Sequence, residues 1–196
     1  INLLEKNYPQ FIPNVSTCKS PQGMIGALIK TYFAKKINKK PEEIFHISIM
    51  PCTAKKDEIV RESLGRDGYR DIDYVMTTRE CAKFFKAHNV TSFEEQSPFD
   101  PPLGMSTGAA AIFGVTGGVM EAVLRTAADK VEGCTSLVTP QMQACRGFEG
   151  IKSAYISVAG HKLQIGAIHG LNNAKRFLDE LTKVGCEKSG FHLIEI

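Results

Sequence analysis

The first periodic pattern of apolar and polar positions predicts a long helix. It begins at Ser20-Pro21, a capping hydroxyl followed by proline at the first helical position. Apolar residues then recur at helical spacing as far as Lys35-Lys36. They are Met24, Ile25, Leu28, Ile29, Tyr32 and Phe33. A polar turn at 38–43 follows, so we expect the helix to end before it.

Two short runs rich in β-branched residues predict buried strands. The first, Ile44–Met50, ends at Pro51, because proline cannot continue a central strand. The second is Ile72–Met76, after which Thr78 is expected to cap a helix over Arg79–Ala87. This order of strand, loop and helix is typical of parallel α/β units. The predicted fold class is therefore α/β, with mostly parallel sheets flanked by helices.

The second half of the chain starts with a long proline-bearing loop, Ser92–Gly108, of the kind that can cross between two lobes. A glycine-rich helix is predicted over Ser106–Lys130. Four early glycines each cost helix stability on the order of 1 kcal/mol relative to alanine. We therefore expect another part of the molecule to pack closely on the backbone there. These glycines are Gly108, Gly114, Gly117 and Gly118.

The remaining pattern predicts a hairpin, a helix and a final strand. Alternating residues over Ser153–Val158 and Lys162–Ile168 flank a turn at Ala159-Gly160. The last strand is predicted from near Phe191. The helix between them, which reaches Val184, is predicted from a cap at Asn172 or Asn173 and a stop at Gly185.

Composition narrows the class of protein. The chain has 196 residues, enough for one large domain or two small ones. Its 43% hydrophobic and 23% charged residues are ordinary for a globular protein. With 24 basic and 21 acidic residues, the net charge of +3 is too balanced to favour nucleic acid or a membrane surface as a partner. No charge-free apolar run reaches the length of a membrane span.

The six cysteines are scattered along the chain. None forms a C-x-x-C pair, which argues against a zinc ribbon, a ferredoxin loop or a thioredoxin motif. Each is interpreted first as a small buried hydrophobe in a reducing compartment, and only Cys52 has a context that suggests chemistry. They are Cys18, Cys52, Cys81, Cys134, Cys145 and Cys186.

Cys52 follows directly on a predicted buried strand, where ligands gather in open α/β sheets. Pro51 stiffens the turn. The cations Lys55 and Lys56 would favour the thiolate, which binds metals and attacks electrophiles. Met50 adds a soft thioether. The pattern fits equally well a buried cysteine at a strand end beside two surface lysines, and both interpretations stay open at this level.

The segment Met50–Glu58 resembles the middle signature of the iron-iron hydrogenases, Met-Pro-Cys-x-x-Lys-x-x-Glu. Cys52, Lys55 and Glu58 fill its fixed positions. Further segments resemble the large-subunit catalytic domain of that family in the same order. The resemblance therefore covers essentially the whole chain, 1–196, as one domain. These segments are Asn14–Gln22, Asp71–Glu80, Ser106–Arg125 and Arg146–Lys152.

The resemblance implies a cofactor and an activity. The family binds a cubane 4Fe-4S cluster, bridged by a cysteine to a di-iron unit with carbonyl, cyanide and azadithiolate ligands, and interconverts protons, electrons and dihydrogen. By resemblance, Cys52 would be one terminal ligand of the cubane, since iron–sulfur iron requires a thiolate. Lys55 would donate a charge-assisted hydrogen bond to a cyanide on the distal iron. Glu58 would be a structural or hydrogen-bonding partner rather than a proton carrier.

Other positions take a role from the same resemblance. Small residues around Gly114 would let the backbone approach the cluster. Ser16 lies where the family has a hydroxyl in its proton relay, and a hydroxyl both donates and accepts. Taken alone, Ser16 also fits an ordinary turn residue, and Met50 and Phe113 also fit plain core packing. The residues that would line the di-iron pocket are Met50, Pro51, Gln22 and Phe113.

The family site also needs a Thr-Ser-Cys-Cys-Pro-type motif and a Met-Ala-Cys-x-x-x-Cys-type motif. These supply the remaining cubane ligands and the cysteine that delivers protons. Neither motif occurs in the 196 residues. We therefore expect the chain to be an internal fragment between the two motifs, and to be inactive by itself.

The resemblance also implies partners and a compartment. These are ferredoxin or a similar electron carrier, protons, dihydrogen and maturation proteins, in the cytoplasm of an anaerobe. Two alternatives belong to other classes. A non-catalytic hydrogenase-like iron–sulfur assembly protein would keep cubane ligands without handling dihydrogen, and Lys55 beside Met50 argues against it. A thiol-redox or small-ligand α/β domain using Cys52 would require the ordered matches to be accidental.

Overall fold

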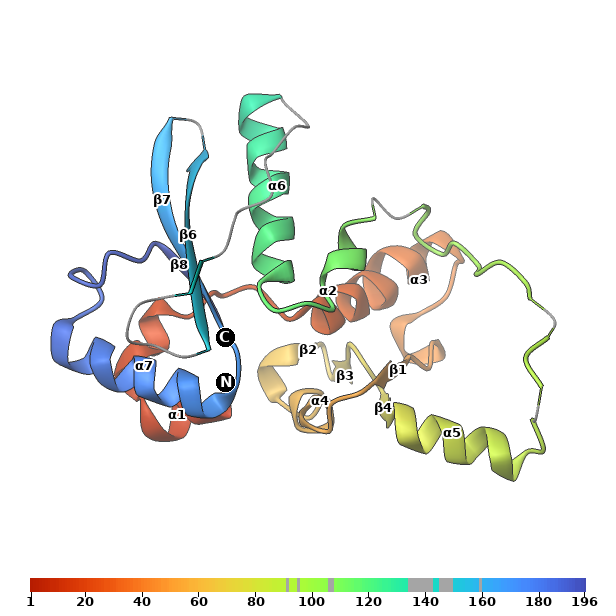
Figure 1. The fold of residues 1–196 in the computed structure, drawn as a ribbon. Helices are drawn as coiled ribbons and strands as arrows, with labels where there is room; N and C mark the ends of the chain where they lie inside the picture. The colour runs from red at the N-terminus through yellow and green to blue at the C-terminus, as the bar shows by residue number, and fades with distance from the viewer. Residues whose placement is uncertain (91, 95, 106–107, 134–142, 145–149, 159) are drawn as a thin grey trace. The chain divides into compact units, whose positions relative to one another are not determined.

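The computed structural model describes residues 1–90, 92–94, 96–105, 108–133, 143–144, 150–158 and 160–196. Contacts within the chain divide it into two compact units, Ile1–Gly104 and Met105–Ile196. Both units combine helices with paired strands (Figure 1). The mixed helix-and-sheet class predicted from the sequence, with parallel strand pairing, is confirmed.

The first unit is built from short elements. Its helices are α1 (Asn2–Asn7), η1 (Pro9–Asn14), α2 (Pro21–Leu28), the π-helical η2 (Ile29–Phe33), α3 (Ala34–Lys36), η3 (Pro41–Glu43), α4 (Ala54–Glu58), η4 (Glu62–Leu64) and α5 (Thr78–Ala87). Its strands are β1 (Ile47–Met50), β2 (Gly65–Arg66), β3 (Tyr69–Arg70) and β4 (Tyr74–Thr77). The two main strands begin later than the apolar runs predicted, at Ile47 and at Tyr74.

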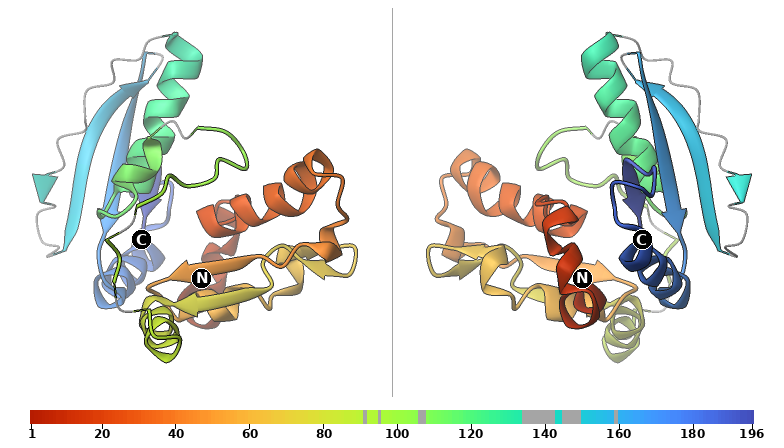
Figure 2. Two further views of the ribbon diagram at one scale, coloured as in Figure 1. Left: turned by 90° about the vertical axis from the view of Figure 1, so that its right-hand side faces the viewer. Right: turned by 90° about the vertical axis from the view of Figure 1, so that its left-hand side faces the viewer.

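A parallel strand pair organises this unit. β1 pairs with β4, from Ile47 opposite Tyr74 to Met50 opposite Thr77. The helix made of α2, η2 and α3 lies on one side of the pair, and α5 lies on the other (Figure 2). The short β2 and β3 pair with each other in antiparallel fashion. This is the strand, loop and helix order expected from the sequence.

The long helix predicted after Ser20 is present as α2, η2 and α3 in succession. The Ser20 hydroxyl accepts a hydrogen bond from the Gly23 N–H at 3.2 Å, as a helix cap does. Lys30, in η2, has a side chain only 1% exposed, and its ammonium lies 2.7 Å from Asp73 Oδ2. It also donates to the carbonyl of Ile44. Because a buried charge needs such compensation, these contacts tie the helix to the segments that lead into β1 and β4.

The cap of α5 is Thr77, and the prediction of Thr78 was wrong by one residue. Thr77 Oγ1 accepts from the Glu80 N–H at 3.1 Å, and Glu80 Oε2 accepts from the Thr77 N–H at 2.8 Å. This reciprocal pair is a capping box, in which the acid stands three residues after the capping hydroxyl. The spacing to Glu80 therefore selects Thr77 over its neighbour.

The second unit carries a mixed sheet. Its elements are η5 (Ala109–Ile112), α6 (Gly118–Glu132), β5 (Gln143–Ala144), β6 (Ile151–Val158), β7 (His161–Ile168), α7 (Leu171–Val184) and β8 (Leu193–Glu195). Among the described strands the order is β5-β6-β7-β8, with the first two pairings antiparallel and β7–β8 parallel. The predicted hairpin is confirmed by the β6–β7 register, and Gly160 in its turn has φ +78°. Ala159 lies outside the described residues.

Helix α6 packs on the hairpin to form the core of the second unit (Figure 1). Every residue of this core is less than one-tenth exposed, and burial of apolar surface at roughly 25 cal/mol per Å² is the main stabilising term for such a layer. The core residues are Met120 and Leu124 of α6, Ala154 and Ile156 of β6, and Ile165 and Ala167 of β7.

The glycine-rich helix begins later than the sequence predicted. α6 starts at Gly118, whereas Gly108 and Gly117 adopt the left-handed conformation, with φ of +83° and +86°. Glycine is favoured at these two positions because it adopts a positive φ without steric cost. A Cβ at Gly118 would overlap the carbonyl of Ile112, and one at Gly117 would lie 3.2 Å from Ala167 Cβ, so the predicted close packing is present at these two glycines. At Gly114 no described atom lies within 4 Å of a built Cβ, and the predicted start at Ser106 lies outside the described residues.

The amino end of α6 is closed by a side chain from the last strand. Glu195 accepts hydrogen bonds from the Gly117 N–H at 2.9 Å and the Met120 N–H at 2.7 Å, one on each carboxylate oxygen. The first N–H groups of a helix have no partner within it. A carboxylate at this end also interacts favourably with the positive end of the helix dipole. Glu195 therefore links β8 to α6 across 75 residues of sequence.

Helix α7 is capped differently from the prediction. It starts at Leu171 after Gly170, with no side-chain cap at its first turn. Both predicted asparagines lie inside the first turn of the helix, so neither is the cap, and Asn173 donates from Nδ2 to the carbonyl of His169 at 2.8 Å. The stop at Gly185, with φ +87°, is confirmed.

The described part of the chain was also compared with two expectations from composition, on membrane spans and on cysteines. None of its helices has the length and apolarity required to cross a lipid bilayer. The cysteines that it contains, Cys18, Cys52, Cys81 and Cys186, are free thiols. Cys134 and Cys145 lie outside the described residues.

The close approach at Gly26 predicts a matched pair of stability effects. A Cβ on Gly26 would meet Ile72 Cγ1 at 2.8 Å and Asp71 O at 2.9 Å, whereas one on Gly23 would meet the nearest atom, Lys19 Cβ, at 3.1 Å. Gly26→Ala should therefore destabilise the protein by about 1 to 3 kcal/mol, as overpacking does, and Gly23→Ala should cost less. Denaturant unfolding of the two variants measures the difference. A Gly26→Ala variant as stable as Gly23→Ala would contradict the packing described.

Candidate functional site

The loop after β1 presents the candidate cysteine to solvent. β1 ends at Met50, which is half-buried, and Pro51 and Cys52 are exposed. The carbonyl of Cys52 accepts the Lys55 N–H at 3.3 Å, so the thiol stands at the start of the turn that becomes α4. A strand end followed by a stiff turn gives this side chain a fixed position while leaving its sulfur free to bind a ligand.

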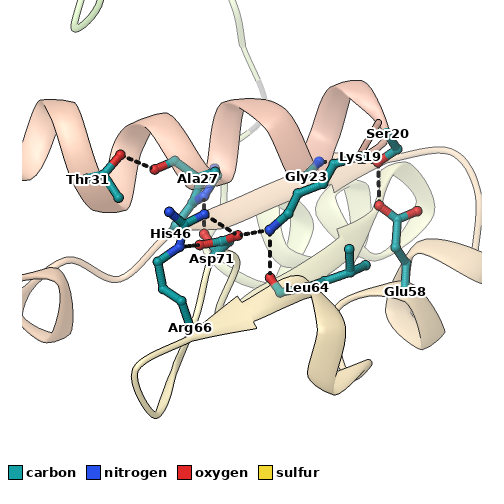
Figure 3. Close-up of polar contacts among 10 residues, drawn as sticks. All are labelled: Lys19, Ser20, Gly23, Ala27, Thr31, His46, Glu58, Leu64, Arg66 and Asp71. Atoms are coloured by element: carbon teal, nitrogen blue, oxygen red, sulfur yellow. Dashed lines mark hydrogen bonds and ion pairs between the residues drawn. The ribbon is translucent and has the colours of Figure 1, made fainter. Parts of the chain in front are cut away.

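Lys55 is held by an acid that also contacts the amino end of α2. Its Nζ lies 2.6 Å from Glu58 Oε2, with the two side chains 25% and 20% exposed. The Ser20 hydroxyl donates to the other carboxylate oxygen, Glu58 Oε1 (Figure 3). Because Ser20 is also the cap of α2, Glu58 joins the Cys52 loop to the amino end of that helix. The ammonium of Lys55 is thereby fixed close to the turn that bears Cys52.

A buried carboxylate anchors the segment that leads into α2. Asp71, with a side chain 3% exposed, lies 2.6 Å from Lys19 Nζ and 3.2 Å from Arg66 Nε (Figure 3). Its backbone carbonyl lies 3.1 Å from His46 Nδ1. Lys19 immediately precedes Ser20, so its ion pair with Asp71 ties the start of α2 to the segment that leads into β4.

Gln22 contributes a buried carboxamide at the first turn of α2. The residue is 2% exposed, and its Oε1 accepts a hydrogen bond from the Ser48 hydroxyl at 2.7 Å. Its Nε2 is buried and has no hydrogen-bond partner among the described atoms. A buried N–H group without a partner costs about 1 to 3 kcal/mol, so this end of the amide is a candidate for binding a ligand.

The next lysine, Lys56, forms an ion pair with a residue of α5. Lys56 Nζ lies 2.6 Å from Glu80 Oε1 of α5, and this hydrogen bond raises the pKa of Lys56. The same bond, with the backbone N–H of Thr77, lowers the pKa of Glu80 to about 2. The two cations expected beside Cys52 are therefore each paired with a carboxylate, Lys55 within α4 and Lys56 with the cap of α5.

Ser16 makes a local contact in the turn before α2. It is exposed, and its Oγ accepts from the Cys18 N–H at 3.2 Å. This is the geometry of an ordinary serine turn. The proton-relay role that the resemblance implies for Ser16 stays a prediction.

Phe113 and Gly114 belong to the second unit. They follow η5, whose last turn includes a hydrogen bond from the Phe113 N–H to Ala110 O at 3.1 Å, and both are exposed. The expected site residues gathered in the first unit surround the end of β1 and the start of α2. They are Gln22, Met50, Pro51, Cys52, Lys55 and Glu58.

The donor atoms suit an iron–sulfur cluster in kind and supply only part of its ligand set. The exposed thiol of Cys52 is the soft ligand that such iron needs. Within the described residues, no group of three or more histidine, cysteine, aspartate or glutamate side chains could hold a metal ion. Cys52 would therefore hold a cluster together with ligands from other residues.

Comparison with known proteins decides the family. The model of the iron only hydrogenase large subunit, C-terminal domain, matches residues 1–196. The chain belongs to this family. It is 44% identical over 192 residues to the periplasmic Fe hydrogenase large subunit of Nitratidesulfovibrio vulgaris, covering 97% of the chain and 45% of that protein. It is 40% identical to iron hydrogenase 1 of Clostridium pasteurianum, covering 98% of the chain and 33% of the relative.

A solved hydrogenase has the same fold. Apo FeFe hydrogenase HydA1 from Chlamydomonas reinhardtii, in a variant form, superposes with a TM-score of 0.81 at 32% identity, over 99% of the chain and 55% of that protein. A more distant relative is the cytosolic iron–sulfur assembly component 3 of Mus musculus, at 30% identity over 98% of the chain and 41% of its own length. The chain thus spans about half or less of these relatives.

Sequence reasoning missed three side chains in or beside the candidate site. Ser20 was identified as a helix cap but not as the partner of Glu58. Ser48 lay in a predicted buried strand, but its contact with Gln22 was not predicted. Asp71 belonged to a segment that resembles the family, but its ion pair with Lys19 was not predicted. A polar residue at an inward-facing strand position was the available signal for Ser48. The other two contacts join segments 38 and 52 residues apart, which periodicity does not reveal.

The pairing of Glu80 predicts a pH dependence of stability. Its pKa is lowered in the folded state from an ordinary 4.5 to about 2, so the stability that it contributes is complete above pH 4.5 and is lost as the pH falls toward 2. Glu80→Gln should reduce the loss of stability between pH 4.5 and 2, measured by denaturant unfolding at each pH. Glu187→Gln, at an exposed carboxylate outside the capping box, is the control. Equal pH profiles for Glu80→Gln and the unmodified protein would contradict this assignment.

Proposed function

We propose that this domain holds part of the hydrogen-converting cofactor of an iron-iron hydrogenase, and that the protein containing it catalyses the reversible reduction of protons to dihydrogen. The observation that carries the proposal is the exposed Cys52 at the carboxyl end of β1, in a chain matched over all 196 residues by the hydrogenase domain family. The cofactor is a 4Fe-4S cubane bridged to a di-iron unit with carbonyl, cyanide and azadithiolate ligands.

Cys52 would be a terminal cubane ligand. The thiolate is the form that binds iron, and the fixed turn after Pro51 holds the sulfur in one place. The other ligands of the cubane would come from residues outside the described set.

Lys55 would donate a charge-assisted hydrogen bond to a cyanide ligand. The Glu58 carboxylate, 2.6 Å away, fixes the direction of the ammonium while leaving it two further N–H donors. Ser20 holds Glu58 in turn. In this role Glu58 positions Lys55 and carries no proton.

Several residues would shape the pocket around the di-iron unit. Met50 and Pro51 extend from β1, and the unpartnered Nε2 of Gln22 would offer a hydrogen bond to an acceptor ligand. Phe113 and Gly114, which belong to the second unit, are proposed as further cofactor-binding residues on the resemblance alone.

When bound, the cofactor supplies the iron at which protons and electrons combine to dihydrogen. The chain's own contribution to proton movement would be the Ser16 hydroxyl, which can accept a proton on one side while donating on the other. Its exposure allows exchange with solvent.

We further propose that the whole protein takes electrons from ferredoxin or a similar carrier, receives its di-iron unit from maturation proteins and works in the cytoplasm of an anaerobe. A role in iron–sulfur assembly, as in the name of the mouse relative, is the alternative. The higher identity to the hydrogenases and the presence of Met50 and Lys55 favour the catalytic role. Hydrogen evolution by the full-length matured protein, with reduced ferredoxin as donor, distinguishes the two.

The ligand role predicts a specific loss of iron. In the full-length protein, Cys52→Ala should remove most cluster iron, whereas Cys18→Ala, at another exposed cysteine of the same unit, should keep it. Iron content and the electron paramagnetic resonance of the reconstituted protein measure this. Normal iron in Cys52→Ala would remove Cys52 from the ligand set.

The two adjacent lysines predict opposite outcomes. Lys55→Met should lower retention of the di-iron unit by about 10- to 100-fold, the usual effect of losing a group that hydrogen-bonds a metal ligand. Lys56→Met should leave the cofactor in place and affect only the stability of α5, because its partner is Glu80. Infrared bands of the carbonyl and cyanide ligands report occupancy. Equal losses in both variants would contradict the assignment of Lys55.

A further inference from the structure

The Gln22 carboxamide is held at one end only. Ser48 Oγ donates to Gln22 Oε1 at 2.7 Å, and the Nε2 group at the other end is buried without a hydrogen-bond partner among the described atoms. Gln22 is 2% exposed and Ser48 is 8% exposed, so water does not readily replace either contact.

The hydrogen bond with Ser48 holds one end of the Gln22 carboxamide and leaves the other end without a partner among the described atoms. A carboxamide has nearly the same shape when it is turned by 180°, but one end accepts hydrogen bonds and the other donates them. When Ser48 donates to Oε1, the acceptor end is occupied, and both N–H donors remain available. Without Ser48, the Gln22 carboxamide would lose the hydrogen bond that holds its acceptor end.

The ligands expected at this site are all acceptors. Cyanide and carbonyl groups on iron present lone pairs and no hydrogen-bond donor. A Gln22 turned with Oε1 toward them would place two acceptors against each other, whereas Nε2 would form a hydrogen bond.

We infer that Ser48 is a positioning residue, whose hydrogen bond to Oε1 holds the Gln22 carboxamide in place so that Nε2 is presented to the di-iron ligands. The inference rests on the proposed function, because the ligands that Nε2 would meet belong to the proposed cofactor. Ser48 itself does not touch the cofactor in this role.

The placement of Ser48 supports a role beyond packing. It lies on β1 two residues before Met50 and four before Cys52, so the strand that leads to the proposed ligand also orients an amide on α2. A strand is a rigid support for such a contact. If the contact served stability alone, both ends of the Gln22 amide would be expected to have hydrogen-bond partners, since an unpaired buried donor is costly.

The test uses the full-length, matured protein and the infrared bands of its carbonyl and cyanide ligands. Ser48→Ala should shift these bands and lower hydrogen turnover by about 10-fold, the scale expected for groups that orient a metal's surroundings. Ser48→Thr, which keeps the hydroxyl and suits a strand, should restore both. Thr31→Val is the matched control, because it removes a hydroxyl that donates to Ala27 O at 2.7 Å in the same helix without touching Gln22.

A double-mutant comparison separates orientation from general disturbance. In a Gln22→Leu background, Ser48→Ala should cause no further band shift, because the amide that it orients is gone. Gln22→Met replaces Gln22→Leu if the latter retains too little cofactor. Equal shifts from Ser48→Ala in both backgrounds would overturn the inference.

A second readout needs no cofactor. In the ¹⁵N-labelled cofactor-free protein, Ser48→Ala should move the side-chain amide resonances of Gln22, whereas Thr31→Val should leave them in place. Unchanged Gln22 resonances in Ser48→Ala would overturn the inference. If the unmodified matured protein binds no iron, the proposed function itself fails. If it binds iron and Ser48→Ala leaves the infrared bands unchanged, only the role of Ser48 fails.

Discussion

The close seating of α2 on the Asp71–Ile72 segment is the constraint from which the candidate site in the first unit follows. At Gly26 the helix backbone approaches Asp71 O and Ile72 so closely that a single methyl group would not fit without movement. The Asp71 carboxylate, buried with Lys19 and Arg66, holds the residue before the helix cap. The position of the helix start is thus set by van der Waals contact along one side and by charge at one end.

Adjacent lysines on α4 illustrate how the same residue type takes two roles. Lys55 pairs with Glu58 in a half-buried contact that is shared with the cap of α2, whereas Lys56 pairs with the exposed Glu80 of α5. Screening by solvent makes the exposed pair a modest contribution to helix stability. The half-buried pair is less screened and holds its cation in one direction, which is what recognition of a fixed anionic ligand requires.

The sequence was sufficient for elements whose signals are local. Ser20 as a cap, the helix through Lys36, the β6–β7 hairpin and the stop at Gly185 all follow from residues within one or two turns of the feature. The predictions that were wrong concern competing local choices, such as Thr77 against Thr78, and the start of the glycine-rich helix, which lies at Gly118. The close packing expected at its glycines is present at Gly117 and Gly118. In the candidate site, motif spacing identified Cys52, Lys55 and Glu58. Contacts such as Ser48 with Gln22 join segments 26 residues apart and depend on how α2 rests on β1, which periodicity does not encode.

The carboxylate of Glu195 has a consequence for the order in which the second unit can form. The first N–H groups of α6 obtain their partner from β8, which is synthesised more than 70 residues later. A ribosome that has completed α6 has therefore produced a helix with an open amino end and an apolar face still awaiting β6 and β7. The helix reaches its final stability only after the last strand has paired beside β7, so this unit should fold as a single late cooperative event rather than element by element during translation.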